Sequence, residues 1–505
     1  MINKMKRNSF RYISFSFISA LLIALLFTSS DFVSMPVQSL KDVVIVGMQW
    51  GVMLAALFAL MLVIASARLL FAVSFPVITV LSATLTYFRY TMNAVLTPMI
   101  LDAALDNDIQ TSADLVSPGL IMLLLFTGII SFFWCRYRWK HISNEKPLVS
   151  VVVGLAGLFI LTGIDKLSRP ISERIPFNIY YTVSRYLEEK EALSSERIDL
   201  SEGAFCKEDS LTVVLVIGES LRPDHLGING YERNTTPKLQ AENIISFPSV
   251  YTHQTYTMRS IPHLLTRADS SDFNRAYTEK SFVHIFNHCG FESFWLANQE
   301  PAKTFVSFMN ECDNLEYANI NKSSYVYDKW LDKDLLPLLD KALSSSHERK
   351  LIILHTIGSH WWYNSHFDEE TTMFKPIVKS RVISSCTPEE MINSYDNTVV
   401  YTDYFLSEVI NRLKDEKAVM IFQSDHGAAL GEDGIWLHAS ETEAAHYAAG
   451  FVWMSDSYSE SFPDYRAKAE DNSKKRIRTD YLFHSILDAA GISSDYIDYT
   501  LSIFR

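Results

Sequence analysis

Carboxylate and imidazole side chains recur directly after three of the chain's short apolar runs. Glu219 follows LTVVLVIG, His355 ends KLIILH, and Asp425 and His426 follow AVMIFQS. Each residue alone more often caps a helix or satisfies a buried polar group, but three such run ends together favour a metal site. Ligands of this kind without a thiolate suit Zn²⁺ or Mn²⁺, at a catalytic rather than a structural site.

The chain also offers hydroxyl groups that a bound metal ion could activate. The segment YTHQTYTMRSIPHLL contains Thr252, Thr255, Thr257 and Ser260, and composition alone does not choose among them. A hydroxyl bound to a divalent cation has a lowered pKa and can attack phosphorus. Because no glycine-rich nucleotide loop is present, these residues favour metal-assisted hydrolysis or group transfer.

Residues 209–505 are expected to position these groups in an α/β domain. Their apolar runs are short and nearly continuous, and they alternate with helical segments such as SYDNTVVYTDYFLSEVINRLKDE. This pattern predicts a largely parallel sheet with helices on both faces. Ligand sites in such sheets lie beyond the carboxyl ends of the strands, where Glu219, Asp425 and His426 are expected.

Residues 1–165 are expected to form a transmembrane domain of five helices. The charge-free apolar stretches cover residues 12–29, 43–65, 69–88, 119–135 and 147–164. Each has about the 17–25 residues that cross a bilayer core. Basic residues gather before the first stretch and between the fourth and fifth, which places the N-terminus in the cytoplasm and everything after Ile164 outside it.

Residues 166–208 are expected to be a linker. It contains IPFNIYYTVSRYLEEKEAL, which is either an amphipathic helix in the membrane interface or an ordinary surface helix. The whole chain of 505 residues has a formal net charge of -13. This acidic balance argues against a nucleic-acid partner, which would need a basic face.

The chain resembles the bacterial inner-membrane phosphoethanolamine transferases of the alkaline phosphatase and sulfatase superfamily. The soluble segments that carry the resemblance are VVLVIGESLRPDHLGINGYERNTTPKL, TYTMRSIP, ILHTIGSH, YDNTVVYTDYFLSEVINRLK and SDHGAALGEDGIWLH. In the N-terminal part, ILDAALDNDIQTSADLVSPGL resembles the family's segment before its fourth helix. The resemblance implies a five-helix transmembrane domain followed by an α/β/α sulfatase-like domain.

The resemblance also implies a set of site residues. Thr257, five residues before Pro262, matches the family's nucleophile. Glu219, Thr257, Asp425 and His426 match its zinc ligands. His360 and His438 match histidines that contact the phosphoryl group, protonate the leaving oxygen or help to hold a second zinc ion. Lys303, four residues beyond Gln299, matches a substrate-binding lysine.

By resemblance, the reaction is a double displacement. Thr257 attacks phosphatidylethanolamine, diacylglycerol leaves, and an acceptor on lipid A or another envelope glycan then takes the phosphoethanolamine. The implied cofactor is Zn²⁺, with Mn²⁺ less favoured, and the protein is expected to act as a monomer in the inner membrane with a periplasmic catalytic domain. The alternatives are a membrane phosphoglycerol transferase, a sulfatase-superfamily hydrolase, or a non-catalytic sensor.

The chain departs from the family beside the nucleophile. His253 and His263 stand where many relatives have cysteines, so that local disulfide is absent. A second metal site at these histidines and ordinary packing both remain open. Four cysteines would face an oxidising space and allow three pairings into two disulfides, namely Cys206, Cys289, Cys312 and Cys386. We expect Cys289 to pair with Cys312.

Overall fold

The chain folds into two compact units. The computed structural model describes residues 2–91, 95–98, 100–101, 105, 117–144, 146–320, 322, 328–437 and 441–505. One unit comprises Met1–Leu187, Asn321–Val326 and Lys379–Ser385, and the other comprises Glu188–Ile320, Tyr327–Val378 and Cys386–Arg505. The division falls within helix α10 (Phe177–Leu193).

All regular secondary structure described in the first unit is helical. Besides α10 it comprises α1 (Ile2–Ile23), a π-helical turn (Ala24–Thr28), α2 (Ser29–Val33), α3 (Leu40–Ile64), α4 (Arg68–Thr91), α7 (Pro118–His141), α8 (Pro147–Gly163), α9 (Asp165–Ser172) and a 3₁₀ turn (Ile383–Ser385). Four spans, Lys6–Val33, Leu40–Ile64, Arg68–Thr91 and Pro118–His141, are long and apolar enough to cross a membrane. The α8–α9 pair adds a fifth if its 101° bend lies within one span.

A buried arginine of this unit finds its hydrogen-bond partners on the backbone, which suits an environment without water. Arg138 is buried, and its guanidinium donates to the carbonyl oxygens of Ala65 (3.1 Å from Nε) and Ile142 (2.7 Å from Nη1). Large apolar side chains such as Met122 and Phe133 instead remain exposed on the helix surfaces. An apolar exterior of this kind suits a lipid environment.

The second unit contains a mixed sheet of eight strands. In sheet order these are β11 (Ile477–Arg478), β3 (Ile245–Tyr251), β10 (Tyr447–Met454), β7 (Ala418–Ser424), β2 (Leu211–Gly218), β6 (Arg349–His355), β4 (Glu292–Ala297) and β5 (Asn314–Tyr317). Only β10 runs antiparallel to its neighbours in this sheet. Two minor sheets pair β1 (Phe205–Cys206) with β12 (Ile492–Ser493), and β8 (Ala429–Leu430) with β9 (Trp436–Leu437).

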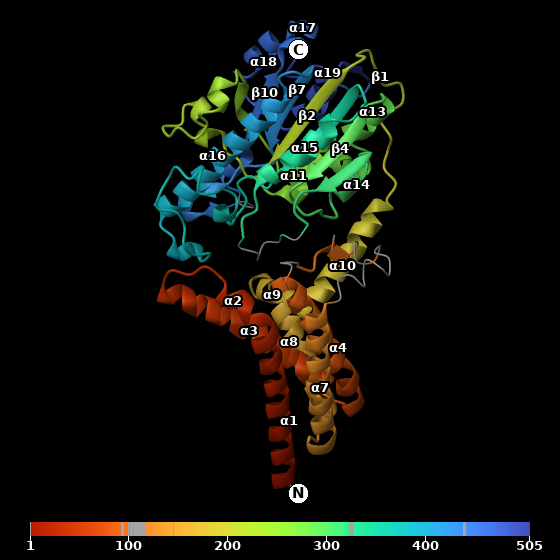
Figure 1. Ribbon diagram of the computed structural model, residues 1–505, viewed down its shortest axis with the longest axis vertical. Coiled ribbons are helices and arrows are strands. Elements are labelled where there is room, and N and C mark those ends of the chain that lie inside the picture. Colours follow the sequence, from red (N-terminus) through yellow and green to blue (C-terminus); the bar gives the residue numbers. More distant parts are fainter. Residues whose placement is uncertain are drawn as a thin grey trace. The chain divides into compact units, whose positions relative to one another are not determined.

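Helices cover the large sheet (Figure 1). On one face α11 (Thr257–Leu265), α13 (Phe282–His288) and α19 (Tyr481–Ala489) share a core with Val213, Leu215 and Ile217 of β2. The alternate β2 side chains point the other way because strand residues alternate between faces. There α15 (Leu336–Leu343) packs on β4 and β6, and α16 (Pro388–Leu413) packs on α15. The predicted α/β/α architecture is confirmed.

The strand directions place seven carboxyl ends at one edge of the sheet. All strands except β10 run the same way, since β3 and β7 are each antiparallel to β10 and the others are linked by parallel pairing. We call this the catalytic edge. Glu219, Gln299 and Asp425 each follow one of these strands within two residues.

Candidate active site

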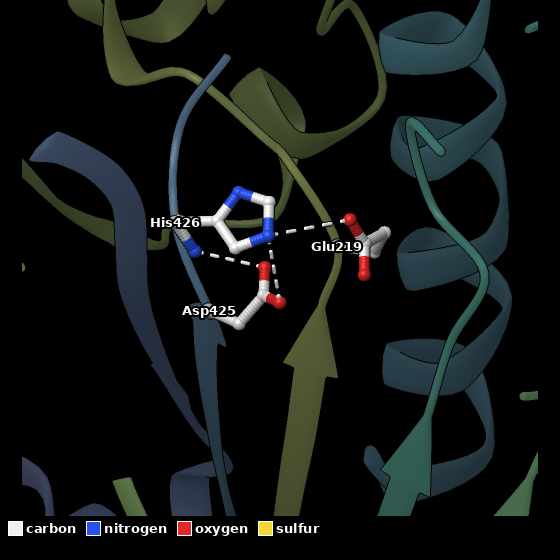
Figure 2. A group of neighbouring side chains, drawn as sticks. All are labelled: Glu219, Asp425 and His426. Carbon is white, nitrogen blue, oxygen red and sulfur yellow. Dashed lines mark hydrogen bonds and ion pairs between the residues drawn. The ribbon is translucent and has the colours of Figure 1, made fainter. Parts of the chain in front are cut away.

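Three fully buried side chains converge at the catalytic edge (Figure 2). Glu219 follows β2, and Asp425 and His426 follow the neighbouring strand β7. At most 1% of each residue is exposed, and one potential ligand atom from each lies within 4.8 Å of the others. His426 Nε2 lies 3.2 Å from Asp425 Oδ2 and 3.6 Å from Glu219 Oε1. The residues predicted at the two strand ends therefore meet.

Hydrogen bonds fix how these groups point. The backbone N–H groups of Ser220 and His426 donate to Asp425 Oδ1 at 3.1 and 2.8 Å. Asp425 Oδ2 is buried and accepts no hydrogen bond from the described residues. His426 Nδ1 donates to the Gly427 carbonyl oxygen at 2.7 Å, so this nitrogen carries the proton. The lone pair of His426 Nε2 consequently faces the two carboxylates.

Thr257 brings its hydroxyl to the same point. It is the first residue of α11, and its Oγ1 donates to Glu219 Oε2 at 2.8 Å and lies 3.4 Å from His426 Nε2. The positive end of the helix dipole lies here and favours negative charge on the threonine oxygen. Among the hydroxyls left open by composition, the structure sets that of Thr257 beside the cluster.

The electrostatics of the cluster fit a divalent cation. Burial, and then the negative charge of Glu219, raise the pKa of Asp425 well above its usual range. Burial lowers the pKa of His426, although Glu219 opposes that shift. Two adjacent buried carboxylates without a cation repel each other, and Asp425 Oδ2 lacks a donor. Two carboxylates, one imidazole and one hydroxyl form a donor set that suits zinc.

Asp332 is a buried carboxylate that the sequence did not suggest as part of the site. It supports the centre by holding a backbone turn next to Glu219. Asp332 accepts hydrogen bonds from Asn298 Nδ2 (2.8 Å) and from the backbone N–H groups of Ile357 (2.8 Å) and Gly358 (3.0 Å). It thereby holds the turn that follows β6. Burial raises its pKa to about 6 despite these three donors. Asp332 begins a 3₁₀ turn, Asp332–Leu335, that leads directly into α15, and no motif marks it.

The turn held by Asp332 rests directly on Glu219. Gly358 has φ +46°, and a Cβ there would lie 2.9 Å from the Glu219 carbonyl oxygen. The Ser359 N–H donates to that same carbonyl oxygen at 3.0 Å. Gln299 Nε2 links Glu219 Oε2 (3.2 Å) to the Thr356 carbonyl oxygen (2.7 Å). The segments that follow β6 and β4 thus fix the position of Glu219, which itself follows β2.

Three predicted site residues remain, namely His360, Lys303 and His438. His360 follows the turn, half-buried, with its ring 6.3 Å from that of His366. Lys303 Nζ lies 2.9 Å from a carboxylate oxygen of Glu188, and the Lys303 side chain is 54% exposed. His438 lies outside the described residues. The roles expected for these three residues therefore stay predictions.

His355 and the two histidines beside the nucleophile pack against aromatic rings. His355 ends β6 within the core, between Trp295 and Phe305, and burial lowers its pKa to about 4. The rings of His253 and His263 both pack edge to face with that of Phe273, with centroid distances of 5.3 and 5.5 Å. None of these three belongs to the metal-type cluster found among the described residues.

The expected disulfide between Cys289 and Cys312 is wrong. All five cysteines are free thiols. Burial raises the pKa of Cys289 to about 11 and that of Cys312 well above its usual range, so both behave as small core side chains. Cys206 instead donates its thiol hydrogen to the Ala490 carbonyl oxygen at 3.3 Å. Cysteine counting could not reveal these surroundings.

Comparison with known proteins gives consistent matches over both units. A family model described as Sulfatase matches residues 212–492, and one described as Phosphoethanolamine transferase EptA/EptB matches residues 53–165. The chain is 30% identical over 464 residues to the Kdo(2)-lipid A phosphoethanolamine 7''-transferase of Escherichia coli (strain K12). That alignment covers 82% of this chain and 81% of the relative.

Solved structures of phosphoethanolamine transferases are similar to this chain in fold. The soluble domain of lipooligosaccharide phosphoethanolamine transferase A from Neisseria meningitidis is 28% identical with a TM-score of 0.57, covering 61% of this chain and 98% of that one. The integral membrane protein lipooligosaccharide phosphoethanolamine transferase A (EptA) from the same organism is 24% identical with a TM-score of 0.56. It covers 97% of this chain and 98% of its own, and this likeness shows the fold.

Fold and site together define a sulfatase-like α/β enzyme domain joined to apolar helices that are long enough to cross a membrane. Within that class, the chain belongs to the phosphoethanolamine transferases, because it shares 30% identity over 82% of its length with a curated member. The family expected from the sequence motifs is confirmed, and the chain is a transferase.

Proposed function

We propose that the protein moves phosphoethanolamine from phosphatidylethanolamine to lipid A or a related envelope glycan, with Thr257 as the nucleophile. The observation that carries the proposal is the placement of Thr257 Oγ1, 2.8 Å from Glu219 Oε2 and 3.4 Å from His426 Nε2 at a helix N-terminus. The curated relative of Escherichia coli is named for transfer to Kdo(2)-lipid A. This name supports lipid A as the acceptor.

Zinc is the cofactor that fits this centre. Glu219, Asp425, His426 and the Thr257 hydroxyl would hold it, since their donor atoms converge and Asp425 Oδ2 otherwise lacks a donor. A bound zinc ion would lower the pKa of the hydroxyl and neutralise charge on the phosphoryl oxygens. One ion is proposed at this cluster, and a second would require His360 or His438.

The first displacement forms a bond between Thr257 Oγ1 and phosphorus and breaks the bond between phosphorus and the diacylglycerol oxygen. Glu219 Oε2 accepts the hydrogen bond of the Thr257 hydroxyl and is therefore placed to take its proton. A histidine, His360 or His438, supplies a proton to the departing oxygen. Diacylglycerol leaves, and the phosphoethanolamine stays on Thr257.

The second displacement reverses these roles. A phosphate or hydroxyl oxygen of the acceptor attacks the same phosphorus, and the histidine takes the proton of an acceptor hydroxyl. The bond between phosphorus and Thr257 Oγ1 breaks, and Glu219 returns the proton to the threonine oxygen. Gln299 and the Asp332 turn keep Glu219 in place through both steps. The apolar helices hold the enzyme in the membrane that supplies its lipid donor, and we propose an inner membrane with the catalytic unit on the periplasmic side.

The test measures diacylglycerol release from fluorescent phosphatidylethanolamine by the purified full chain with zinc. Wild type should release it, Thr257→Ala should lose release by at least about a thousandfold, and Thr257→Ser should recover part of it. Ser260→Ala is the matched control, because Ser260 lies on the same helix and donates only to backbone carbonyls. Equal release by wild type and Thr257→Ala would refute the proposal.

A further inference from the structure

A cationic cavity lies beside the last residue of β3, at the edge strand of the sheet. Its volume is about 570 Å³. The polar side chains of its lining include Tyr251, Lys475, Arg476, Arg478, Thr500 and Ser502. We call this cavity the edge pocket. It has no part in the chemistry at Thr257 described above.

Arg476 is held in the edge pocket by rings rather than by hydrogen bonds. Its guanidinium carbon lies 5.2 Å from the ring centroid of Tyr251 and 5.4 Å from that of Tyr447. No hydrogen bond or ion pair joins it to the part of the chain that the structure describes. The two rings lie edge to face, with centroids 5.9 Å apart. Their contact orients the guanidinium while its N–H donors remain available for a planar oxyanion.

The charges around Arg476 leave the pocket positive. Lys475 Nζ donates to the neutral Asn472 Oδ1 at 2.7 Å, and no described carboxylate pairs with it. Arg478 pairs with Asp480 at 2.7 Å, so those two charges cancel. Lys475 and Arg476 thus form no ion pair with a described carboxylate, although the formal net charge of the chain is -13. Such a local excess of positive charge attracts anions.

The edge pocket is tied to the nucleophile through β3. β11 runs parallel to β3 with Arg478 opposite Tyr251, and the Thr479 N–H donates to the Tyr251 carbonyl oxygen at 2.9 Å. Tyr251 precedes Thr257 by six residues. The His446 ring stacks on Tyr251 at 5.3 Å, and its Nδ1 contacts the Thr252 carbonyl oxygen at 2.8 Å. The edge pocket and Thr257 therefore both lie at the catalytic edge.

We propose that the edge pocket binds a second phosphate of the acceptor while another acceptor oxygen attacks the phosphorus on Thr257. This inference rests on the proposed function, in which the acceptor is a multiply phosphorylated glycolipid. Arg476 would donate two parallel N–H groups to the phosphate, and Lys475 would add a point charge. The donor lipid has one phosphate, which is bound at Thr257, so the pocket distinguishes acceptor from donor.

The experiment measures the acceptor KM of the zinc-loaded full chain in nanodiscs, with lipid A carrying two phosphates and with its monophosphorylated form. Arg476→Ala should raise the KM for the bisphosphorylated form by about tenfold, the scale for loss of a charge-assisted hydrogen bond, and change that for the monophosphorylated form little. Arg476→Lys should be intermediate. Lys474→Ala is the matched control, because Lys474 lies in the same segment but pairs with Asp471 at 3.0 Å and does not line the pocket.

The outcomes separate this inference from the function on which it rests. If wild type transfers no phosphoethanolamine to either acceptor, the proposed function fails. If wild type transfers it and Arg476→Ala has the wild-type KM, or shares its loss with Lys474→Ala, only the edge pocket is refuted. A loss that appears only when phosphatidylglycerol is added to the nanodisc would identify a membrane-surface contact and also refute it. Wild-type zinc content and Tm in each variant check folding.

Discussion

The buried centre and the edge pocket lie on the same edge of one sheet but differ in their surroundings. Glu219, Asp425 and His426 are at most 1% exposed, and hydrogen bonds fix the direction of each. In the edge pocket Lys475 and Arg476 are exposed, and two rings orient the guanidinium. Buried charges interact strongly and tolerate little change, whereas exposed charges interact weakly and are screened by salt. The buried centre therefore suits the chemical step, and the edge pocket suits recognition of the acceptor.

The largest effect should come from a change inside the buried centre. Asp425→Asn removes the carboxylate whose Oδ2 lacks a donor, and activity should fall by about a thousandfold or more. Zinc at a hundredfold excess over its Kd should stabilise wild type by about 2.7 kcal/mol, and the variant much less. Thermal unfolding with and without zinc measures this difference.

Asp415→Asn is the control for that variant. Asp415 is exposed and precedes β7, whereas Asp425 follows it, so the same substitution is made at the opposite end of one strand. This variant should keep the zinc-dependent rise in Tm. A rise of equal size in Asp425→Asn and wild type would show that Asp425 does not hold the metal.

A smaller effect is expected from a change at Asp332, which supports the position of Glu219 but does not belong to the cluster. Asp332→Asn leaves one of the Ile357 and Gly358 N–H groups poorly paired, which should cost about 1–3 kcal/mol of stability. Because the turn rests on Glu219, kcat should fall by about tenfold while the donor KM changes little. Steady-state kinetics on both substrates separates these parameters.

The exposed Asp334 is the matched control, because it accepts one hydrogen bond from Asn319 and does not touch the turn. Asp334→Asn should match wild type. If Asp332→Asn loses stability but keeps the wild-type kcat, Asp332 supports the fold and not Glu219.

The smallest expected effect is a difference in salt dependence between the two regions. Raising NaCl from about 0.05 to 0.5 M shortens the screening length severalfold and should raise the acceptor KM, because Lys475 and Arg476 are exposed. The value of kcat should hardly move, since the centre is buried. Arg476→Ala should flatten the salt dependence of KM. A kcat that falls with salt as steeply as acceptor binding would contradict the contrast between the regions.

The sequence predicted those site residues that directly follow a buried parallel strand. Glu219 and Asp425 follow long buried runs, and parallel strands place their ends together, so their meeting needed no further information. Thr257 was one of four hydroxyls, and only the resemblance to the family selected it. A helix start six residues beyond β3 sets its position, and that spacing is a property of the fold.

Other contacts depend on structure that carries little sequence signal. Asp332 reaches Gly358 across 26 residues of chain, and no motif in the surrounding segment marks it. β11 contains two residues, too few for a visible alternation, so the meeting of Arg476 with Tyr251 could not be foreseen. The wrong Cys289–Cys312 pairing has the same cause, because counting cysteines gives no information about distance.

The most direct test of the central claim is the mass of the peptide that contains Thr257 after the zinc-loaded full chain has been incubated with phosphatidylethanolamine and no acceptor. The account predicts a phosphoethanolamine adduct on Thr257 that disappears when acceptor is added and never forms in Thr257→Ala. Diacylglycerol release without an adduct on Thr257, or with one on another residue, would contradict it.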